Sequence, residues 1–252
     1  MPEDFCKSVF IPIPKVARTT ECKQFRTISL ISHAAKVLLT VIHNRIKPTV
    51  EEHLSEDQYG FRRGRGTREC IFSLRILCER ALEMQQNMYV CFVDFEKAFD
   101  RVRHNKLVQI LLNIGIDIND IRIIKTLYWT QEAAVRIGNG LSNWCKVRRG
   151  VRQGCVLSPL LYNLYSEMLM REVIRDEDGI NINGTGVSNI RYADDTAFIA
   201  RSPEELQGFL DRLQTRGAKY GLHINVGKTR VMAISRDKTK PVIGITVAGQ
   251  DL

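Results

Sequence analysis

The chain has 252 residues, with 37 lysines and arginines against 28 aspartates and glutamates, and therefore a formal net charge of +9. This length is enough for one large domain or two small subdomains with a substantial core, and the hydrophobic content of 44% is ordinary for a globular protein. No apolar run is long enough to span a bilayer, and no signal-peptide pattern opens the chain. We therefore expect a protein that is not secreted and has no membrane partner.

The cysteines and histidines do not indicate a metal or disulfide framework. The seven cysteines are odd in number, and no two of them form a CxxC pair. Several lie in apolar runs, which indicates buried, reduced thiols and therefore an intracellular protein, in the nucleus or the cytoplasm. The histidines at 33, 43 and 53 are evenly spaced but not at a metal-ligand interval, so we expect structural or surface roles for them.

The basic residues are grouped rather than mixed with acidic ones. Residues 133–166 contain no aspartate or glutamate, and "QYGFRRGRGT" at 58–67 forms a second basic stretch. A solvated basic surface is one interpretation, but grouped cations produce a continuous positive field that favours a polyanionic partner. The cations of the two stretches are Arg62, Arg63, Arg65, Arg136, Lys146, Arg148, Arg149 and Arg152.

The first part of the chain, residues 1–87, predicts an extended arm followed by helices. "IPIPK" at 11–15 reads as extended, because each proline disfavours helix at the preceding residue. Apolar residues recur at helical spacing after residue 34, and we expect Pro48 to end that helix. A second helical pattern covers residues 71–82, with Thr67 as a plausible cap.

The pattern then changes to alternating strands and helices. "MYVCFVDF" at 88–95 predicts a strand that ends in Asp94, and "AAVRIGNGLSNWCKV" predicts a hairpin with Asn139-Gly140 at its turn. A further hairpin is expected around Asp194, and Ser202 is expected to cap the helix after it. The remaining expected elements are helices at 104–115, 118–129 and from Ser158 onward with Pro159 in the first turn, and a last strand at 230–235.

Without the helical and hairpin insertions, residues 88–235 read strand, helix, strand, strand, helix, strand. This order predicts an α+β fold, a ferredoxin-like split βαβ with an antiparallel sheet backed by helices. In such a sheet the strand that ends at Asp94 lies near the hairpin that carries Asp194 and Asp195. We therefore expect the three carboxylates to converge.

Three converging carboxylates need partners, because half-buried unpaired charges are strongly unfavourable. Divalent cations supply them: Mg²⁺ binds carboxylate oxygens together with substrate phosphates, and two such ions can support an in-line displacement. The alternative is an ordinary turn, where aspartate is common. The apolar strands on both sides and the strand-borne Asp94 favour the cation site.

Four ordered motifs carry a family resemblance. "FVDFEKAFDRV", "RRGVRQGCVLSPLLYNLY", "IRYADDTAFIA" and "GLHINVGKT" follow the order and approximate spacing of motifs A, B, C and D of reverse transcriptases. "IPIPK", "FRTISL" and "SEDQYGFRRGRGT" resemble finger motifs of the same group. From about residue 2 to its end, the chain resembles the reverse transcriptase of non-LTR, LINE-type retrotransposons.

The resemblance implies a right-hand polymerase with fingers at 1–87, a palm at 88–235, and a tail at 236–252 that stops before the expected primer-grip hairpin and thumb. It implies an RNA-directed DNA polymerase that adds deoxynucleotides to a primer 3′-OH. The implied partners are an RNA template, a DNA primer and deoxynucleoside triphosphates, and the implied cofactor is a pair of Mg²⁺ ions for which Mn²⁺ can substitute. The family's endonuclease domain has no room in this chain.

The resemblance also assigns the catalytic and metal-binding residues. Asp94, Asp194 and Asp195 would hold the two ions, with the main chain of Phe95 nearby. Lys228 would lie near the leaving pyrophosphate as a proton donor, although a plain surface lysine remains an equal alternative.

The implied nucleotide-binding residues come from several motifs. Lys15 and Arg26 would contact the triphosphate, unless they are ordinary surface cations. Phe99 would be a steric gate against a ribose 2′-OH, rather than a core phenylalanine. Gln153 and Gly154 would line the nucleotide pocket.

The implied template and primer contacts use the basic stretches and the ends of motifs B and C, with Tyr59 and Phe61 either stacking on a template base or packing beneath the fingers. The residues assigned are Arg62, Arg63, Arg65, Arg149, Arg152, Ser158, Pro159, Tyr192 and Ala193.

Two alternatives remain open from the sequence. A polymerase that makes RNA would require a small or ribose-binding residue where Phe99 stands. A truncated or domesticated relic would bind RNA, with a strong salt dependence, but would not polymerise.

Overall fold

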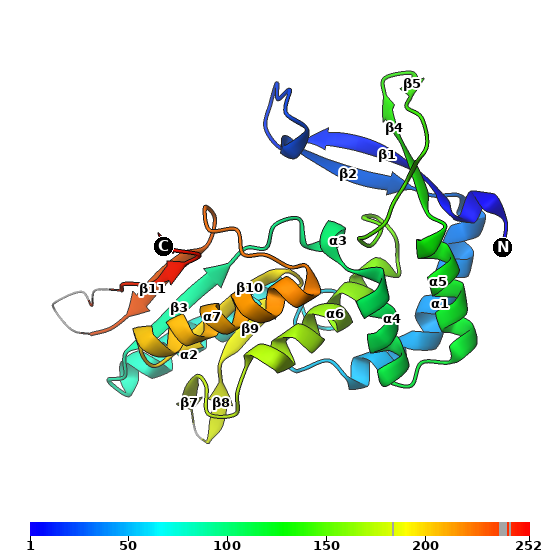
Figure 1. Cartoon of the computed structure of the whole chain (residues 1–252). Helices are drawn as coiled ribbons and strands as arrows, with labels where there is room; N and C mark the ends of the chain where they lie inside the picture. Colours follow the sequence, from blue (N-terminus) through cyan, green and yellow to red (C-terminus); the bar gives the residue numbers. More distant parts are fainter. Residues whose placement is uncertain (183, 237–240, 242) are drawn as a thin grey trace. The chain divides into compact units, whose positions relative to one another are not determined.

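The computed structural model describes residues 1–182, 184–236, 241 and 243–252 (Figure 1). The chain forms two compact units. Unit 1 consists of Met1–His53 and Phe99–Leu164, and unit 2 of Leu54–Ala98 and Tyr165–Leu252. The two units therefore interleave along the chain, and the division into fingers at 1–87, palm at 88–235 and a tail at 236–252 stays a prediction. None of the described helices is long and apolar enough to cross a membrane.

Unit 1 combines a mixed sheet with helices. Its strands run in the order β2-β1-β4-β5, with β6 also paired to β4; β1 and β4 are parallel and the other pairs are antiparallel. The strands are β1 (Lys7–Pro14), β2 (Phe25–Leu30), β4 (Glu132–Ile137), β5 (Gly140–Leu141) and β6 (Cys145–Lys146). The helices are η1 (Glu3–Phe5), η2 (Cys22–Gln24), α1 (His33–Glu52), α3 (Ala98–Arg101), α4 (His104–Asn113), α5 (Ile118–Trp129) and the start of α6 (Ser158–Val173).

The proline-rich segment is extended, as predicted, and forms the distal half of β1. The strand β4 pairs with β1 only from Lys7 to Phe10. Pro12 and Pro14 lie beyond this contact and pair with β2 alone. Proline lacks an N–H donor and is tolerated where one side of a strand has no neighbour, which explains its place here.

Two local predictions in unit 1 are wrong. Helix α1 does not end at Pro48 but continues to Glu52, because Ile46 and Val50 on either side of the proline are buried and keep that turn packed. The β4–β5 turn is not Asn139-Gly140. Ile137 pairs with Gly140, so the two loop residues are Gly138 and Asn139, and Gly138 supplies the positive φ of 58°. A glycine in the first loop position is one of the two arrangements that suit the twist of a hairpin.

Unit 2 is built on an antiparallel sheet with the strand order β11-β3-β10-β9. This order is that of the split βαβ arrangement, so the predicted fold class is confirmed. The strands are β3 (Met88–Val93), β9 (Asn189–Tyr192), β10 (Asp195–Ala200) and β11 (Arg230–Ile234). The other elements are α2 (Thr67–Glu83), the end of α6, α7 (Pro203–Tyr220), and the pairs β7 (Ile180–Ile182) with β8 (Thr185–Val187) and β12 (Thr246–Val247) with β13 (Gln250–Asp251).

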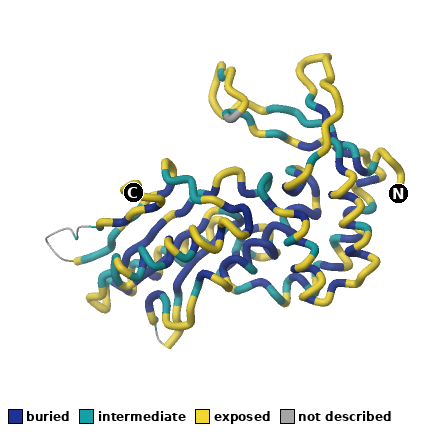
Figure 2. Tube along the Cα trace, viewed as in Figure 1, coloured by how far each residue is buried: buried dark blue, intermediate teal, exposed yellow. Residues whose placement is uncertain are grey.

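Helices cover both faces of the unit 2 sheet. Successive strand residues point to opposite faces, so Val90 joins Leu77 of α2 in one apolar cluster, whereas Phe198 stacks on Phe209 of α7 at 5.1 Å between ring centroids. The central strands are accordingly buried along most of their length (Figure 2). This two-sided burial explains why β3 and β10 read as continuous apolar runs.

A buried ion pair joins the sheet to α6. Arg191 of β9 donates to Glu167 at 2.9 Å, and the two side chains are only 1% and 4% exposed. Arg171 lies 3.5 Å from the same carboxylate but is half exposed. Glu167 therefore depends on Arg191 for its internal partner.

Replacing Arg191 by methionine should lower the free energy of unfolding by about 3 kcal/mol, because it leaves the Glu167 carboxylate buried without its closest cation. Urea unfolding followed by circular dichroism measures this loss. Arg75→Met is the matched control, since it breaks the exposed Arg75–Glu79 pair and should cost less than about 1 kcal/mol. Equal losses in the two variants would contradict the assigned role of Arg191.

Candidate functional site

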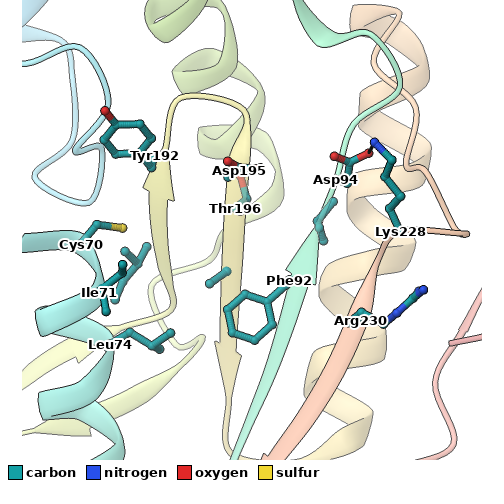
Figure 3. Close-up of a pocket in the computed structure, with 13 residues that line it drawn as sticks. Cys70, Ile71, Leu74, Phe92, Asp94, Tyr192, Asp195, Thr196, Lys228 and Arg230 are labelled. Carbon is teal, nitrogen blue, oxygen red and sulfur yellow. Dashed lines mark ion pairs between the residues drawn. The ribbon is translucent and has the colours of Figure 1, made fainter. Parts of the chain in front are cut away.

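The register of two neighbouring strands brings two distant aspartates together. Strand β10 pairs with β3 so that Thr196 lies opposite Val93. The next position along each strand is Asp195 and Asp94, which therefore project from the same edge of the sheet. Figure 3 shows both carboxylates at the same end of adjacent strands. The meeting of a strand-end aspartate with the hairpin aspartates, expected from the sequence, is confirmed for this pair.

The segment after α7 holds Asp94 in place. Asn225 donates its side-chain amide to Asp94 Oδ2 at 2.9 Å and its main-chain N–H to Asp94 O at 2.8 Å. Thr229 Oγ1 accepts from the Asp94 N–H at 3.5 Å, and Lys228 Nζ lies 3.6 Å from Asp94 Oδ2. In this segment the sequence predicts a role for Lys228 but gives no local signal for Asn225 and Thr229, although both lie in "GLHINVGKT".

The two carboxylates affect each other electrostatically. Asp195 stays accessible, yet loss of hydration beside the surrounding side chains raises its pKa, and the nearby charge of Asp94 raises it further. The Lys228 ammonium lowers the pKa of Asp195, in opposition to both effects. A cation placed between the carboxylates would relieve their repulsion, so the pair has the chemistry of a metal site.

Asp194 is the third of the predicted metal-binding carboxylates. It lies half-buried in the turn between β9 and β10, and nowhere in the described part of the chain do three or more histidine, cysteine, aspartate or glutamate side chains form a group that could hold a metal. Mg²⁺ nevertheless needs only one or two carboxylates when waters and substrate phosphates supply its other ligands. The Asp94–Asp195 pair fits an ion held in that way.

A cavity of about 530 Å³ opens beside the carboxylates (Figure 3). Its walls are mainly apolar and come from α2 and from the face of the sheet that α2 covers, and its charged groups are Asp94, Asp195, Lys228 and Arg230. Phe92, two residues before Asp94, contributes a ring that is 38% exposed. The carboxylates thus border a space of the size that ligands occupy.

In unit 1, the "GVRQG" loop at 150–154 is tied to two neighbouring segments. Gln153 O accepts from the Ser29 N–H at 2.8 Å, and Gln153 Nε2 donates to Asp100 Oδ1 at 2.9 Å. Gly150 has φ 93°, and a Cβ there would lie 2.8 Å from Asp100 O, so only glycine fits. The loop therefore holds Gln153 next to β2, the strand that carries Arg26.

The other predicted nucleotide-binding residues of unit 1 lie on β2, after β1 and in α3. Lys15 follows β1 and is linked to Gln24, while Arg26 pairs with Ile13, so both cations lie exposed at the same end of the β1–β2 pair. Phe99 is half-buried and stacks on Tyr162 at 4.4 Å between centroids. Gly154 has φ 95°, in the left-handed region that favours glycine, and its place in a nucleotide pocket stays a prediction.

The structure corrects the predicted template or primer contact of three residues. Arg152 is 3% exposed and donates to the main-chain oxygens of Phe5 and Leu127. Ser158 is 1% exposed at the start of α6. Ala193 is 5% exposed, and both its N–H and its C=O bond to the Gln58 side chain. The side chains of these three residues are buried and are not exposed to a template or primer strand.

The arginine loop is partly engaged within unit 2. Arg62 donates to Ser55 O at 2.7 Å, and Arg65 pairs with Glu56, whereas Arg63 is exposed. Tyr59 bonds through its hydroxyl to Ser73 at 2.9 Å, which favours packing over base stacking. Phe61 is 54% exposed, so its stacking role stays a prediction.

The remaining predicted contacts are accessible to different degrees. Arg149 is exposed and lines a cavity of about 160 Å³ in unit 1, together with Asp100 and Gln153. Pro159 is half-buried near the start of α6. Tyr192 lines the larger cavity of unit 2 beside the carboxylates (Figure 3).

Comparison with known proteins agrees with this geometry. The family model described as "Reverse transcriptase (RNA-dependent DNA polymerase)" matches residues 13–247. The chain belongs to the reverse transcriptase family. Reverse transcriptases generally use divalent metal ions, in keeping with the chemistry of the Asp94–Asp195 pair.

The relatives of this reverse transcriptase chain come from mobile elements. It is 26% identical over 92% of its length to the "Retrovirus-related Pol polyprotein from type-1 retrotransposable element R2" of Nasonia vitripennis, and covers 22% of that protein. It is 27% identical over 89% of its length to the "RNA-directed DNA polymerase from mobile element jockey" of Drosophila funebris, and covers 25% of it. The resemblance to non-LTR, LINE-type reverse transcriptases is confirmed, and the chain spans about a quarter of these relatives.

A solved structure confirms the polymerase fold. Apo telomerase from Candida tropicalis, truncated from its C-terminal domain, superposes with a TM-score of 0.70 at 17% identity, over 98% of this reverse transcriptase chain and 53% of that one. At this level of identity the likeness concerns the fold alone.

His104 generates a pH prediction for unit 1. It lies in α4, and its Nε2 lies 2.8 Å from Gly150 O, which anchors the start of the 150–154 loop. Burial lowers the pKa of His104, with the Gly150 contact acting in the opposite direction. Because the unfolded state then binds more protons, stability should fall as the pH falls from about 7.5 through the unfolded value of about 6.5.

Urea unfolding at about pH 7.5 and about pH 5.5 measures this effect. His104→Gln should reduce the loss between the two pH values, since glutamine does not titrate. The exposed His33 serves as the control, and His33→Gln should leave the loss unchanged. An identical loss in wild type and His104→Gln would contradict the prediction.

Proposed function

We propose that this chain is the polymerase core of an RNA-directed DNA polymerase, which adds deoxynucleotides to a primer 3′-OH on an RNA template. The observation that carries the proposal is the Asp94–Asp195 pair at the ends of adjacent antiparallel strands, within a sheet of the order β11-β3-β10-β9. The family match and the name of the jockey relative support the same activity. The partners that follow are an RNA template, a DNA primer and deoxynucleoside triphosphates.

Asp94, Asp194 and Asp195 would hold two divalent cations, with Mg²⁺ as the natural ion, Mn²⁺ as a substitute and the main chain of Phe95 nearby. When bound, the ions activate the attacking hydroxyl and stabilise the leaving oxygen of an in-line displacement. Asn225 fixes the Asp94 carboxylate through its 2.9 Å hydrogen bond, so that an oxygen stays directed toward the site.

Lys228 has two roles in this proposal. Without substrate, its Nζ lies 3.6 Å from Asp94 and partly offsets the repulsion between the carboxylates. Its side chain is 65% exposed, so it can turn toward a triphosphate and donate a proton to the pyrophosphate as it leaves. Lys15 and Arg26, both exposed, would neutralise charge on the triphosphate.

Phe99, Gln153 and Gly154 would select and hold the incoming nucleotide. Phe99 is only five residues after Asp94 in the chain, and its stacking on Tyr162 limits the movement of the ring. A fixed ring at this point would clash with a ribose 2′-OH. Arg63, Arg149 and the partly engaged Arg62 and Arg65 would contact nucleic-acid phosphates, which gives affinity without reading sequence, and Tyr192 and Pro159 would complete the strand contacts.

Primer extension on a poly(rA) template with Mg²⁺ or Mn²⁺ tests the activity. The double variant Asp194→Asn/Asp195→Asn should extend more than about 100-fold more slowly than wild type, because amides do not supply the negative charge that the cations require. The measurement is the rate of deoxynucleotide incorporation at saturating primer and template.

Asp176→Asn is the matched control, since Asp176 is an exposed carboxylate in a loop of unit 2 and should leave the rate unchanged. Extension by wild type no faster than by the double variant would refute polymerase activity for this chain. Salt-dependent RNA binding without extension would then favour the relic.

Sugar selection tests Phe99 independently. Phe99→Val should raise ribonucleotide incorporation relative to deoxynucleotide incorporation by at least about 10-fold, since removing the ring opens space for the 2′-OH. Tyr162→Phe keeps a ring stacked on Phe99 and should preserve the wild-type preference. The ratio of kcat/KM for the two nucleotides is the readout, and an unchanged ratio in Phe99→Val would refute the gate.

A further inference from the structure

A short segment before α2 forms an extra edge of the unit 2 sheet. Residues 57–60, which we name the edge segment, pair in parallel with β9 through a bridge between Gln58 and Arg191. The Arg191 N–H donates to Asp57 O at 2.9 Å, and the Tyr59 N–H donates to Arg191 O at 2.8 Å. The edge segment is therefore fixed to the strand that leads into the Asp194–Asp195 turn.

The Gln58 side chain reaches from the edge segment to that turn. Its Oε1 accepts from the Ala193 N–H at 2.9 Å and from the Gly60 N–H at 2.8 Å, and its Nε2 donates to Ala193 O at 3.3 Å. The residue has no exposed surface. One amide thus bonds both main-chain polar groups of Ala193 in an environment where unpaired groups are costly.

Ala193 needs this support because its backbone is unusual. Its φ is 59°, in the left-handed region that residues other than glycine seldom adopt, and it directly precedes Asp194. Such a conformation costs about 1 kcal/mol or more and persists only where the surroundings enforce it. The conformation of Ala193 sets the direction in which the chain presents the two following aspartates.

Gly60 completes the contact from the other side. A Cβ at Gly60 would lie 2.3 Å from Ala193 N and 2.9 Å from Ala193 Cα. Both neighbours are backbone atoms, so a side chain there would displace the turn itself. The main chain of the edge segment is packed directly against the turn.

We propose that Gln58 is a positioning residue for the active site: it holds Ala193 in its left-handed conformation, and thereby orients Asp194 and Asp195 toward Asp94 for cation binding. Gly60 is the steric counterpart that permits this close approach. The inference rests on the cation-binding role of the aspartates in the proposed function. It attributes their orientation to Gln58, a residue outside the four polymerase motifs.

If Gln58 only stabilised the fold, replacing it should have the same effect as replacing another buried residue that holds the edge segment. Asn189 is such a residue. Asn189 is 1% exposed and also links β9 to the edge segment, through its donation to Asp57 Oδ2 at 3.2 Å. Within the described part of the chain, its side-chain amide donates to Asp57 and Ser188 and not to the turn. Replacing either Gln58 or Asn189 should weaken the contact between the edge segment and β9, but only replacing Gln58 should change the orientation of Asp194 and Asp195.

The test compares Gln58→Met with Asn189→Leu by Mn²⁺ binding, without nucleotide or primer. Methionine keeps the length of the side chain but neither donates nor accepts for Ala193. We expect Gln58→Met to weaken Mn²⁺ binding about 10-fold, the usual scale for partners that orient metal ligands, and Asn189→Leu to change it less than about twofold. Electron paramagnetic resonance of free Mn²⁺ gives the affinities, and Asp195→Asn identifies binding at the carboxylates.

The possible outcomes distinguish failure of this inference from failure of the proposed function. Mn²⁺ binding lost in Asp195→Asn but unchanged in Gln58→Met would overturn the inference and leave the polymerase intact. Equal weakening in Gln58→Met and Asn189→Leu would overturn it as well. Binding that responds to Gln58→Met in a chain that extends no primer would support the inference and refute the polymerase.

Two further measurements keep the inference testable if Gln58→Met does not fold. In the wild-type protein, the Ala193 amide should exchange its hydrogen as slowly as the amides of β10, and fast exchange would overturn the inference. Gly60→Ala keeps glutamine at position 58 but places a methyl group 2.3 Å from Ala193 N, so it displaces the turn and should also weaken Mn²⁺ binding about 10-fold. Unchanged binding in Gly60→Ala would count against the close contact.

Discussion

Two carboxylates at the ends of neighbouring strands repel each other, and the rest of unit 2 is arranged around that repulsion. The antiparallel register of β3 and β10 leaves Asp94 and Asp195 side by side, and apolar side chains on the sheet and α2 remove part of their water. A fold that only had to be stable would gain by replacing one of them. The protein instead keeps both and places Lys228 within ion-pair distance of Asp94.

Keeping the pair requires that each aspartate be held separately. Asp94 is fixed by Asn225 and Thr229, which come from the segment that follows α7. The Asp194–Asp195 turn is fixed by Gln58, which comes from the opposite edge of the sheet. Rigid support of this kind is what a cation site requires, because the geometry of carboxylate ligands determines how well an ion binds.

The positive charge of the chain serves two different purposes. Arg191 and Arg152 are buried and bond to Glu167 or to main-chain oxygens, so they stabilise the interior. Arg63 and Arg149 are exposed and can bind a polyanion. The sequence does not distinguish the buried arginines from the exposed ones, because the flexible arginine side chain can direct its guanidinium toward the interior or toward solvent.

The sequence by itself determined the order of strands and helices in the split βαβ unit, the four polymerase motifs and the identity of the Asp94, Asp194 and Asp195 carboxylates. Apolar runs, turn residues and motif spacing are local signals, and they predicted the strand ending at Asp94 and the split βαβ order. Only the tertiary structure decided that Arg152 and Ser158 face inward, that Pro48 lies inside a helix, and that Gln58 bonds to a turn 135 positions further along the chain. These outcomes depend on packing between distant segments, and no local pattern records which buried polar group will find which partner.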